Sequence, residues 1–191
     1  MNITILPLGY LQTNCYILQG EGGCIVIDPG DQADVVLRNL GGKKLEAILL
    51  THGHFDHVGA VRDLAAETDC RVFLCAEDRT LSQAMTAGQL YCTDTYGEGD
   101  ILTLCGLTVS VVHTPGHTPG SVCLCCGNAM FSGDTLFAGS IGRTDFPGSS
   151  PAQMKTSLER LKSLEQNFTV YPGHGESTTL NEEKRYNPFL R

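Results

Sequence analysis

Residues 45–57 read LEAILLTHGHFDH, an apolar run followed at once by a cluster of side chains that can bind metal. Three of the chain's six histidines lie here, at His52, His54 and His57. Side-chain direction alternates along an extended chain, so His52 and His54 project to the same side and can reach one metal ion. Asp56 and His57 follow as the chain turns toward a helix, and they can offer a carboxylate and an imidazole to a second ion. The pattern HxHxDH therefore predicts a metal centre at the end of a buried strand.

Three more candidate ligands follow other predicted strands, each beside a glycine. They are His117 in HTPGHTPG, Asp134 in FSGDT and His174 in YPGHG. Loops at strand ends are common places for a site on a rigid sheet, and glycine permits tight turns there. Five histidines and two aspartates are enough for two ions that share one carboxylate. Imidazole and carboxylate suit zinc, iron or manganese, and the lack of cysteine in these motifs argues against a closed structural zinc site.

Apolar runs and turn residues predict further strands and helices on both sides of the cluster. Residues 76–100 are weakly patterned, with helical character around 81–85, and residues 133–149 indicate a long loop. Two β-rich halves that each carry helices favour a four-layer αββα arrangement, although periodicity alone equally allows a generic α/β or α+β domain. The predicted strands are 3–8, 14–18, 24–27, 45–50, 71–75, 101–104, 107–112, 121–126, 129–131 and 168–171; the predicted helices are 31–40, 58–66, 151–164 with Ser150 as N-cap, and 181–186.

Length and composition indicate a folded chain with few charges. A length of 191 residues is compatible with one domain, and an apolar fraction of 41% with 18% charged residues argues against disorder. No run approaches the roughly 20 apolar residues that span a bilayer. A net charge of -8 without a basic stripe argues against a nucleic-acid partner. The start lacks a signal-peptide pattern, so we expect a cytoplasmic protein whose nine cysteines are thiols.

The seven candidate ligands resemble, in order and spacing, the metal-binding motifs of the metallo-β-lactamase superfamily. The resemblance extends from Asp28-Pro29-Gly30 to the loop around His174, and it implies an αββα sandwich with the site at one edge between the sheets. We assign catalytic roles to Asp56 and Asp134. The ligand sets that the resemblance implies are His52, His54 and His117 for the first ion, Asp56, His57 and His174 for the second, and Asp134 as the bridge.

Residues 133–146 and the ending EEKRYNP resemble glyoxalase II-type thioester hydrolases and are also similar to persulfide dioxygenases. Full glyoxalase II enzymes continue into a helical domain that holds glutathione, so we expect residues 1–191 to form one catalytic domain without it. The resemblance implies a metallohydrolase that cleaves a thioester such as S-lactoylglutathione or a related hydroxyacyl-thiol. A hydroxide that bridges two divalent ions would be the nucleophile. Zinc is the expected metal, and iron and manganese are compatible.

The same residues are also compatible with a second activity. A persulfide dioxygenase would hold one iron through His52, His117 and Asp134, a set of two histidines and one carboxylate. The negative charge disfavours a nuclease, the missing signal peptide disfavours a β-lactamase, and an open ligand set disfavours a non-enzymatic metal protein. The expected partner is a small-molecule thioester, with no nucleic acid and no membrane. The sequence leaves the oligomeric state open.

Other residues near these motifs have two readings. Asp28 either contacts a metal ligand or only forms a turn before Pro29, and Arg143 pairs either with a substrate carboxylate or with a structural partner. His113 is placed at a strand end, outside the metal site. Cys123 and Cys126 form a CxxC, but residues three apart on a strand face opposite sides, so we expect buried thiols rather than redox or zinc chemistry.

Overall fold

The computed structural model describes residues 1–86 and 88–191, and two six-stranded sheets form its centre. In the first sheet the strands follow chain order, antiparallel from β1 to β3 and parallel from β3 to β6. These strands are β1 (Asn2–Leu8), β2 (Thr13–Gln19), β3 (Gly23–Ile27), β4 (Lys44–Leu50), β5 (Arg71–Cys75) and β6 (Asp94–Tyr96).

The second sheet has the order β14-β13-β10-β9-β8-β7, and its one parallel pair is β10 with β13. A separate two-stranded hairpin joins β11 (Leu136–Phe137) to β12 (Ser140–Ile141). The strands of the second sheet are β7 (Ile101–Leu104), β8 (Leu107–His113), β9 (Val122–Cys126), β10 (Ala129–Gly133), β13 (Thr169–Pro172) and β14 (Thr178–Thr179).

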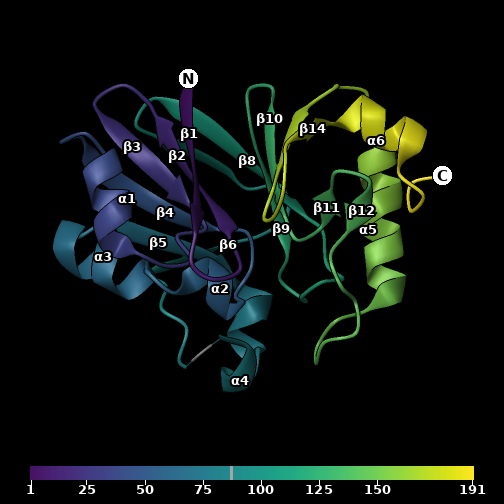
Figure 1. The fold of residues 1–191 in the computed structure, drawn as a ribbon, viewed down its shortest axis with the longest axis horizontal. Helices are drawn as coiled ribbons and strands as arrows, with labels where there is room; N and C mark the ends of the chain where they lie inside the picture. Colours follow the sequence, from purple (N-terminus) through teal and green to yellow (C-terminus); the bar gives the residue numbers. More distant parts are fainter. Residues whose placement is uncertain (87) are drawn as a thin grey trace.

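Helices cover the outer faces of both sheets (Figure 1). The helices α1 (Ala33–Asn39) and α3 (Val61–Thr68) pack on the first sheet, and α5 (Pro151–Ser163) and α6 (Leu180–Tyr186) pack on the second. The predicted αββα arrangement is therefore confirmed. Three short helical segments complete the chain: α2 (Phe55–Val58), the 3-10 helix η1 (Ala76–Thr80) and α4 (Gln83–Thr86).

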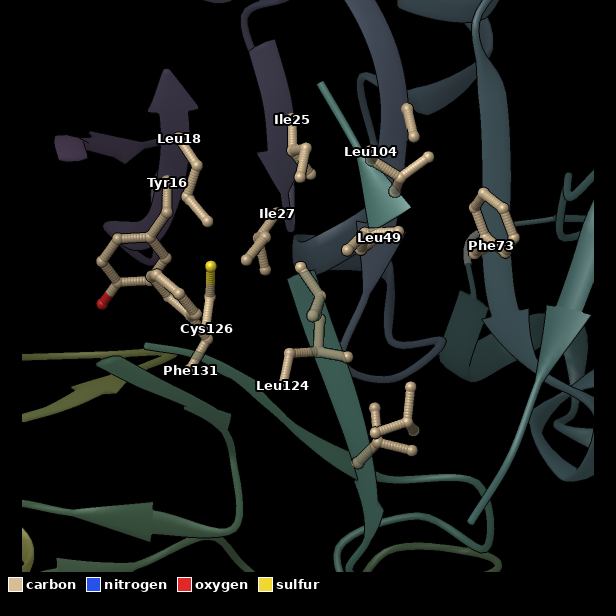
Figure 2. Close-up of a cluster of buried hydrophobic side chains, with 14 of the residues drawn as sticks. Tyr16, Leu18, Ile25, Ile27, Leu49, Phe73, Leu104, Leu124, Cys126 and Phe131 are labelled. Atoms are coloured by element: carbon tan, nitrogen blue, oxygen red, sulfur yellow. The ribbon is translucent and has the colours of Figure 1, made fainter. Parts of the chain in front are cut away.

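Alternating side chains build the core, because most strands are buried on both faces. Tyr16 and Leu18 of β2 face the second sheet, whereas Cys15 and Ile17 face the helices on the other side. Figure 2 shows the layer between the sheets, where Leu18 and its neighbours on β3 and β4 meet Phe131 and other side chains from the second sheet. Such close packing of two sheets holds their strands in fixed positions relative to one another.

Two local predictions are confirmed by the same packing. Cys126 lies in the layer between the sheets and Cys123 lies under α5, so the two thiols face opposite sides of β9 and both are buried. Ser150 is the N-cap of α5, and its hydroxyl accepts a hydrogen bond from the Gln153 amide at 3.3 Å.

Several boundaries differ from the predictions. The predicted helix 58–66 is split, because α2 ends at Val58 and α3 begins at Val61. The chain turns between them where Gly59 packs against the carbonyl of Gly30, so closely that a Cβ at Gly59 would clash with it. The predicted loop 133–149 contains the β11–β12 hairpin, and β6, η1 and β14 were not predicted. These segments have two to five residues and carry no clear apolar pattern of their own.

Among the described residues, the helices are too short or too polar for any of them to cross a membrane.

Candidate metal centre

Four strand ends bring the seven candidate ligands to one edge between the sheets. The segment after β4 carries the HxHxDH motif, and the loop after β8 carries His117. Because β10 and β13 run parallel, Asp134 and His174 leave the second sheet side by side. The Gly173 amide donates to the Gly133 carbonyl at 2.8 Å and keeps the two loops together. The fold therefore explains why residues far apart in sequence converge.

Glycine at position 173 is required by this close approach. A Cβ atom there would collide with the carboxylate of Asp134 and with the imidazole of His57. The same loop is tied to the first sheet, because the side-chain amide of Asn14 donates to the Pro172 carbonyl at 3.1 Å. The glycine of the YPGHG motif thus makes room for the site.

The first group of ligands is formed by His52, His54 and His117. One ring nitrogen from each lies within 4.8 Å of the others. Nδ1 of His54 is 2.8 Å from Nε2 of His117. All three side chains are buried. This is the set of three imidazoles that the sequence predicts for one ion.

The second group is formed by Asp56, His57 and His174, whose donor atoms also lie within 4.8 Å of one another. Oδ2 of Asp56 is 3.2 Å from Nε2 of His174 and 3.6 Å from Nε2 of His57. His174 is the most exposed of the five histidines, with 29% of its side chain accessible. A solvent molecule or a ligand can therefore reach this side of the centre.

Asp134 lies between the two groups. Its Oδ2 is 3.4 Å from Nε2 of His117 and 3.7 Å from Nε2 of His174, and its Oδ1 is 3.4 Å from Nε2 of His57. One carboxylate therefore reaches both groups, which is the arrangement that a bridging ligand needs.

Several polar atoms at the centre are buried without a hydrogen-bond partner among the described residues. They are Nε2 of His52, His54 and His57, and Oδ1 of Asp134. Buried polar atoms in folded proteins are nearly always paired, and leaving one unpaired costs about 1–3 kcal/mol. Nitrogen and oxygen donors converge here, so the residues fit a pair of divalent cations.

The protonation states of the first ligand group and of Asp134 also suit metal binding. Burial lowers the pKa of His52 well below its usual value, and burial with the nearby His117 lowers the pKa of His54 to about 4. Burial likewise lowers the pKa of His117. For Asp134, burial raises the pKa but the nearby His57 outweighs it, so the pKa is lowered. At neutral pH these imidazoles are neutral and the carboxylate is ionised, as ligands must be.

A cavity of about 500 Å³ opens onto the centre. Its floor includes Asp134 and His117, and most of its walls are apolar. Among its described lining residues, Arg143 is the one titratable side chain outside the seven candidate ligands. The apolar side chains of the wall are Leu11, Phe55, Met85, Phe137, Ile141 and Phe146.

Comparison with known proteins identifies the family. The profile described as "Metallo-beta-lactamase superfamily" matches residues 8–174. The chain belongs to the metallo-β-lactamase superfamily. It is 36% identical to hydroxyacylglutathione hydrolase GloC of Haemophilus influenzae, over 100% of this chain and 98% of that protein.

Two crystal structures of superfamily members are similar over nearly the whole chain. BLEG-1 B3 metallo-beta-lactamase has a TM-score of 0.92 at 34% identity, and 99% of each chain is covered. TTHA1623 in a di-iron-bound form has a TM-score of 0.87 at 41% identity, with 98% of this chain and 100% of that chain covered. The fold is thus shared with a protein described as a metallo-beta-lactamase and with one solved in a di-iron-bound form.

Asp28 contacts a candidate ligand of this metallo-β-lactamase centre. Its Oδ2 accepts a hydrogen bond from Nδ1 of His57 at 2.9 Å. Its carboxylate also accepts from the amide and hydroxyl of Thr51, at 2.8 and 2.6 Å. Burial lowers the pKa of His57, but Asp28 and Asp134 outweigh it and raise that pKa. Of the two readings of Asp28, the structure shows the contact, and Asp28 also adopts a positive φ of 51° at the turn.

Replacing Asp28 with alanine is expected to weaken metal binding by about 10–100-fold, because the residue that orients a ligating imidazole is lost. Competition with a chromophoric chelator measures the affinity. Asp34→Ala, which removes an exposed carboxylate of α1 paired with Arg38, is the control and is expected to bind metal as the wild type does. Equal affinities in the two variants would contradict this role of Asp28.

Asp78 is a residue of the site that the sequence did not reveal. It lies in η1, is fully buried, and joins the loop of the HxHxDH motif to the loop of His117. Its carboxylate accepts from the Gly53 amide at 2.7 Å, from the Gly120 amide at 2.6 Å and from the Thr118 hydroxyl at 2.9 Å. Aspartates are common in weakly patterned segments, so no signal in residues 76–100 marks this one.

The Asp78→Ala variant is expected to lose about 3 kcal/mol of unfolding free energy, because buried amides of both loops lose their acceptor. Urea denaturation of the metal-free protein measures this loss. Glu77→Ala alters the preceding, exposed residue and is expected to stay within about 0.5 kcal/mol of wild type in the same experiment. A loss below 1 kcal/mol for Asp78→Ala would contradict the assigned contacts.

Arg143 lines the cavity and makes one of the two kinds of contact foreseen, the structural one. Its guanidinium makes two hydrogen bonds to the carboxylate of Asp145, at 2.9 and 2.8 Å, and lies 4.3 Å from the ring centre of Phe146. Its backbone carbonyl accepts a hydrogen bond from Nδ1 of His117 at 2.8 Å. The structural ion pair is present, and a role in substrate binding remains a prediction. His113 lies apart from both ligand groups.

Proposed function

We propose that this metallo-β-lactamase superfamily member hydrolyses a hydroxyacyl thioester such as S-lactoylglutathione with a pair of divalent metal ions. The observation that carries the proposal is that, apart from the candidate metal ligands, no described side chain of the cavity wall releases a proton near neutral pH. The described cavity wall offers only Arg143 besides the candidate ligands, and a guanidinium does not release its proton near neutral pH. Such a cavity favours a leaving group that departs without protonation.

A thioester meets this requirement. A thiol has a reference pKa of about 8.5, so a thiolate is a stable leaving group near neutral pH. The amine released from an amide needs a proton in the transition state, and besides the candidate metal ligands no described side chain of the cavity wall would supply it. The similarity to a hydroxyacylglutathione hydrolase over the whole chain supports the same substrate class.

The metal ions and the side chains of the centre would have different roles in the reaction. When bound, two divalent ions acidify water and place positive charge against the carbonyl oxygen. His52, His54 and His117 would hold one ion, and Asp56, His57 and His174 the other. Asp134 would hold both ions, because its carboxylate reaches both ligand groups.

Asp56 is held for this task by two contacts. Thr13 donates its hydroxyl to Oδ2 of Asp56 at 2.9 Å, and His174 lies 3.2 Å from the same atom. Burial raises the pKa of Asp56, but hydrogen bonds from His174 and Thr13 outweigh it and hold the pKa well below its usual range. The carboxylate is therefore ionised and oriented, as a metal ligand needs to be.

The apolar walls would shield the acyl thioester from bulk water. Arg143 would leave Asp145 and pair with a carboxylate of the substrate.

Zinc is the ion we propose first, with iron or manganese as alternatives that the same donors accept. All nine cysteines are free thiols, which supports a reducing, cytoplasmic location.

A substrate comparison tests the proposal. Metal-loaded protein is expected to hydrolyse S-lactoylglutathione at least 100-fold faster than the matching amide, and to consume no oxygen with glutathione persulfide. Thiol release measured with a chromogenic disulfide and an oxygen electrode report the two reactions. Oxygen uptake without thioester cleavage would overturn the proposal in favour of the persulfide dioxygenase.

The His174→Ala variant separates these two activities. His174 belongs to the second ligand group, so its loss is expected to lower thioesterase kcat/KM by about 10²-fold. A dioxygenase with iron on His52, His117 and Asp134 would keep its metal. Retention of full thioesterase activity in His174→Ala, with wild-type metal content, would contradict the use of a second ion.

A further inference from the structure

A second cluster of metal-binding side chains lies outside the centre described above. Sγ of Cys75, a carboxylate oxygen of Glu77 and a ring nitrogen of His113 lie within 4.8 Å of one another. Sγ of Cys75 is 2.9 Å from Oε2 of Glu77. The seven ligands of the centre take no part in this cluster. It is also the one such group among the described residues that contains a cysteine.

The topology explains why these three residues meet. Cys75 ends β5 in the first sheet, Glu77 follows in η1, and His113 ends β8 in the second sheet. The backbone at His113 is held from two sides, because its amide donates to Glu98 at 2.8 Å and its carbonyl accepts from Arg160 at 3.2 Å. The cluster therefore joins strand ends from the two different sheets.

The hydrogen bond of His113 leaves one of its ring nitrogens free for a metal. Nε2 of His113 lies 2.8 Å from the carbonyl oxygen of Pro119. A carbonyl only accepts, so Nε2 carries the proton and Nδ1 carries the lone pair. Histidines that bind metal usually donate their other N–H to a carbonyl or carboxylate in this way. The same contact fixes the orientation of the ring.

Burial and charge at the cluster also suit a cation. Cys75 is 1% exposed and packs in the layer between the sheets, whereas Glu77 is exposed and His113 is half-buried. An ion can thus approach from solvent past Glu77 and bind the buried sulfur of Cys75. A thiolate and a carboxylate together balance the charge of a divalent cation. Arg160 does not oppose it, because its guanidinium is paired with Glu98.

We propose that Cys75, Glu77 and His113 form a separate mononuclear site for a zinc-class divalent cation that links the two sheets. Sulfur, nitrogen and oxygen donors together are typical ligands of zinc, and water would complete four-coordination. On binding, the cation replaces the thiol proton of Cys75, which passes to solvent. Burial and the adjacent Glu77 raise the pKa of this thiol to about 12, so the cation and not the pH must remove the proton.

The link would also act on the metallo-β-lactamase centre. Glu77 immediately precedes Asp78, the carboxylate that joins the loop of Gly53 to the loop of Gly120. A cation bound only by the folded chain stabilises that fold. We therefore expect the site to stabilise the sheet edge that carries the centre, without entering the reaction.

Cobalt(II) spectroscopy tests the proposal independently of any activity. The metal-free protein is titrated with cobalt(II), and a thiolate ligand gives an intense charge-transfer band in the near ultraviolet. The seven ligands of the centre contain no sulfur and give only weak visible bands. The wild type is expected to show the charge-transfer band, and Cys75→Ser and His113→Ala are expected to lack it. Cys92→Ser, which alters a partly buried thiol outside the cluster, is expected to keep it.

Metal counting completes the experiment. After dialysis against zinc, both cluster variants are expected to hold one ion fewer than the wild type. They are expected to keep the visible cobalt bands of the centre and most of the activity, which also shows that they fold. If Cys75→Ser fails to fold, His113→Ala alone tests whether the charge-transfer band depends on the proposed site. A wild type saturated with cobalt that shows no charge-transfer band, or a band that persists in folded Cys75→Ser or His113→Ala, would overturn the proposal.

Discussion

Replacing Asp134 with alanine is expected to lower kcat/KM for thioester hydrolysis by about 10³-fold or more and to remove about one bound ion per chain. The oxygens of Asp134 approach both ligand groups, at 3.4 Å from Nε2 of His117 and 3.4 Å from Nε2 of His57. Without it, the imidazoles can still hold an ion, but the two ions lose the ligand they share. Activity and metal content should therefore fall together. Steady-state kinetics measures the activity, and elemental analysis of the same preparation measures the metal content.

The matched control for this experiment is Asp63→Ala, which removes an exposed carboxylate from the first turn of α3. Its activity and metal content are expected to equal those of the wild type. Asp134→Asn serves as a conservative variant, since it keeps the shape but removes the charge. The account of the site would be wrong if Asp134→Ala kept more than about a tenth of the wild-type rate.

Removal of metal with a chelator is expected to abolish hydrolysis and to lower the melting temperature by roughly 8–16 °C. An ion present at about 1,000 times its Kd stabilises the folded state by about 4.1 kcal/mol, and for a chain of this size each kcal/mol shifts the melting temperature by about 2–4 °C. The polar atoms without partners at His52, His54 and His57 give the physical reason, because the ions supply those missing contacts. Differential scanning calorimetry measures the shift.

Readdition of zinc, iron(II) or manganese(II) one at a time then shows which ion restores the rate. Cys75→Ser, which lacks the proposed mononuclear site but keeps all seven ligands of the centre, isolates the contribution of the centre to the shift. A melting temperature that chelation leaves unchanged in both proteins would contradict the proposal that ions stabilise this edge.

The parts of the site that could be predicted are those with a local signal. His52 and His54 are two residues apart after an apolar strand, so strand geometry alone places them together. The meeting of Asp134 with His174 depends on the parallel pairing of β10 and β13, which no local pattern reports. For these more distant residues the resemblance to a family supplied what periodicity could not.

Other features needed the folded chain. Asp78 is an aspartate in a weakly patterned segment, and only the convergence of two loops on its carboxylate reveals its role. His113 was correctly separated from the centre, but its neighbour Cys75 lies 38 residues away in sequence and on the other sheet. The β11–β12 hairpin was interpreted as loop because two-residue strands have no measurable alternation. Long-range contacts decide the first two of these cases, and the shortness of the strands decides the third.

The most direct test of the central claim is a crystal structure of the protein grown with zinc, with anomalous scattering recorded above and below the zinc edge. We expect two anomalous peaks roughly 3.5–4 Å apart, one among His52, His54 and His117 and one among Asp56, His57 and His174, with Asp134 between them. A single peak, or two peaks away from these seven side chains, would contradict the account.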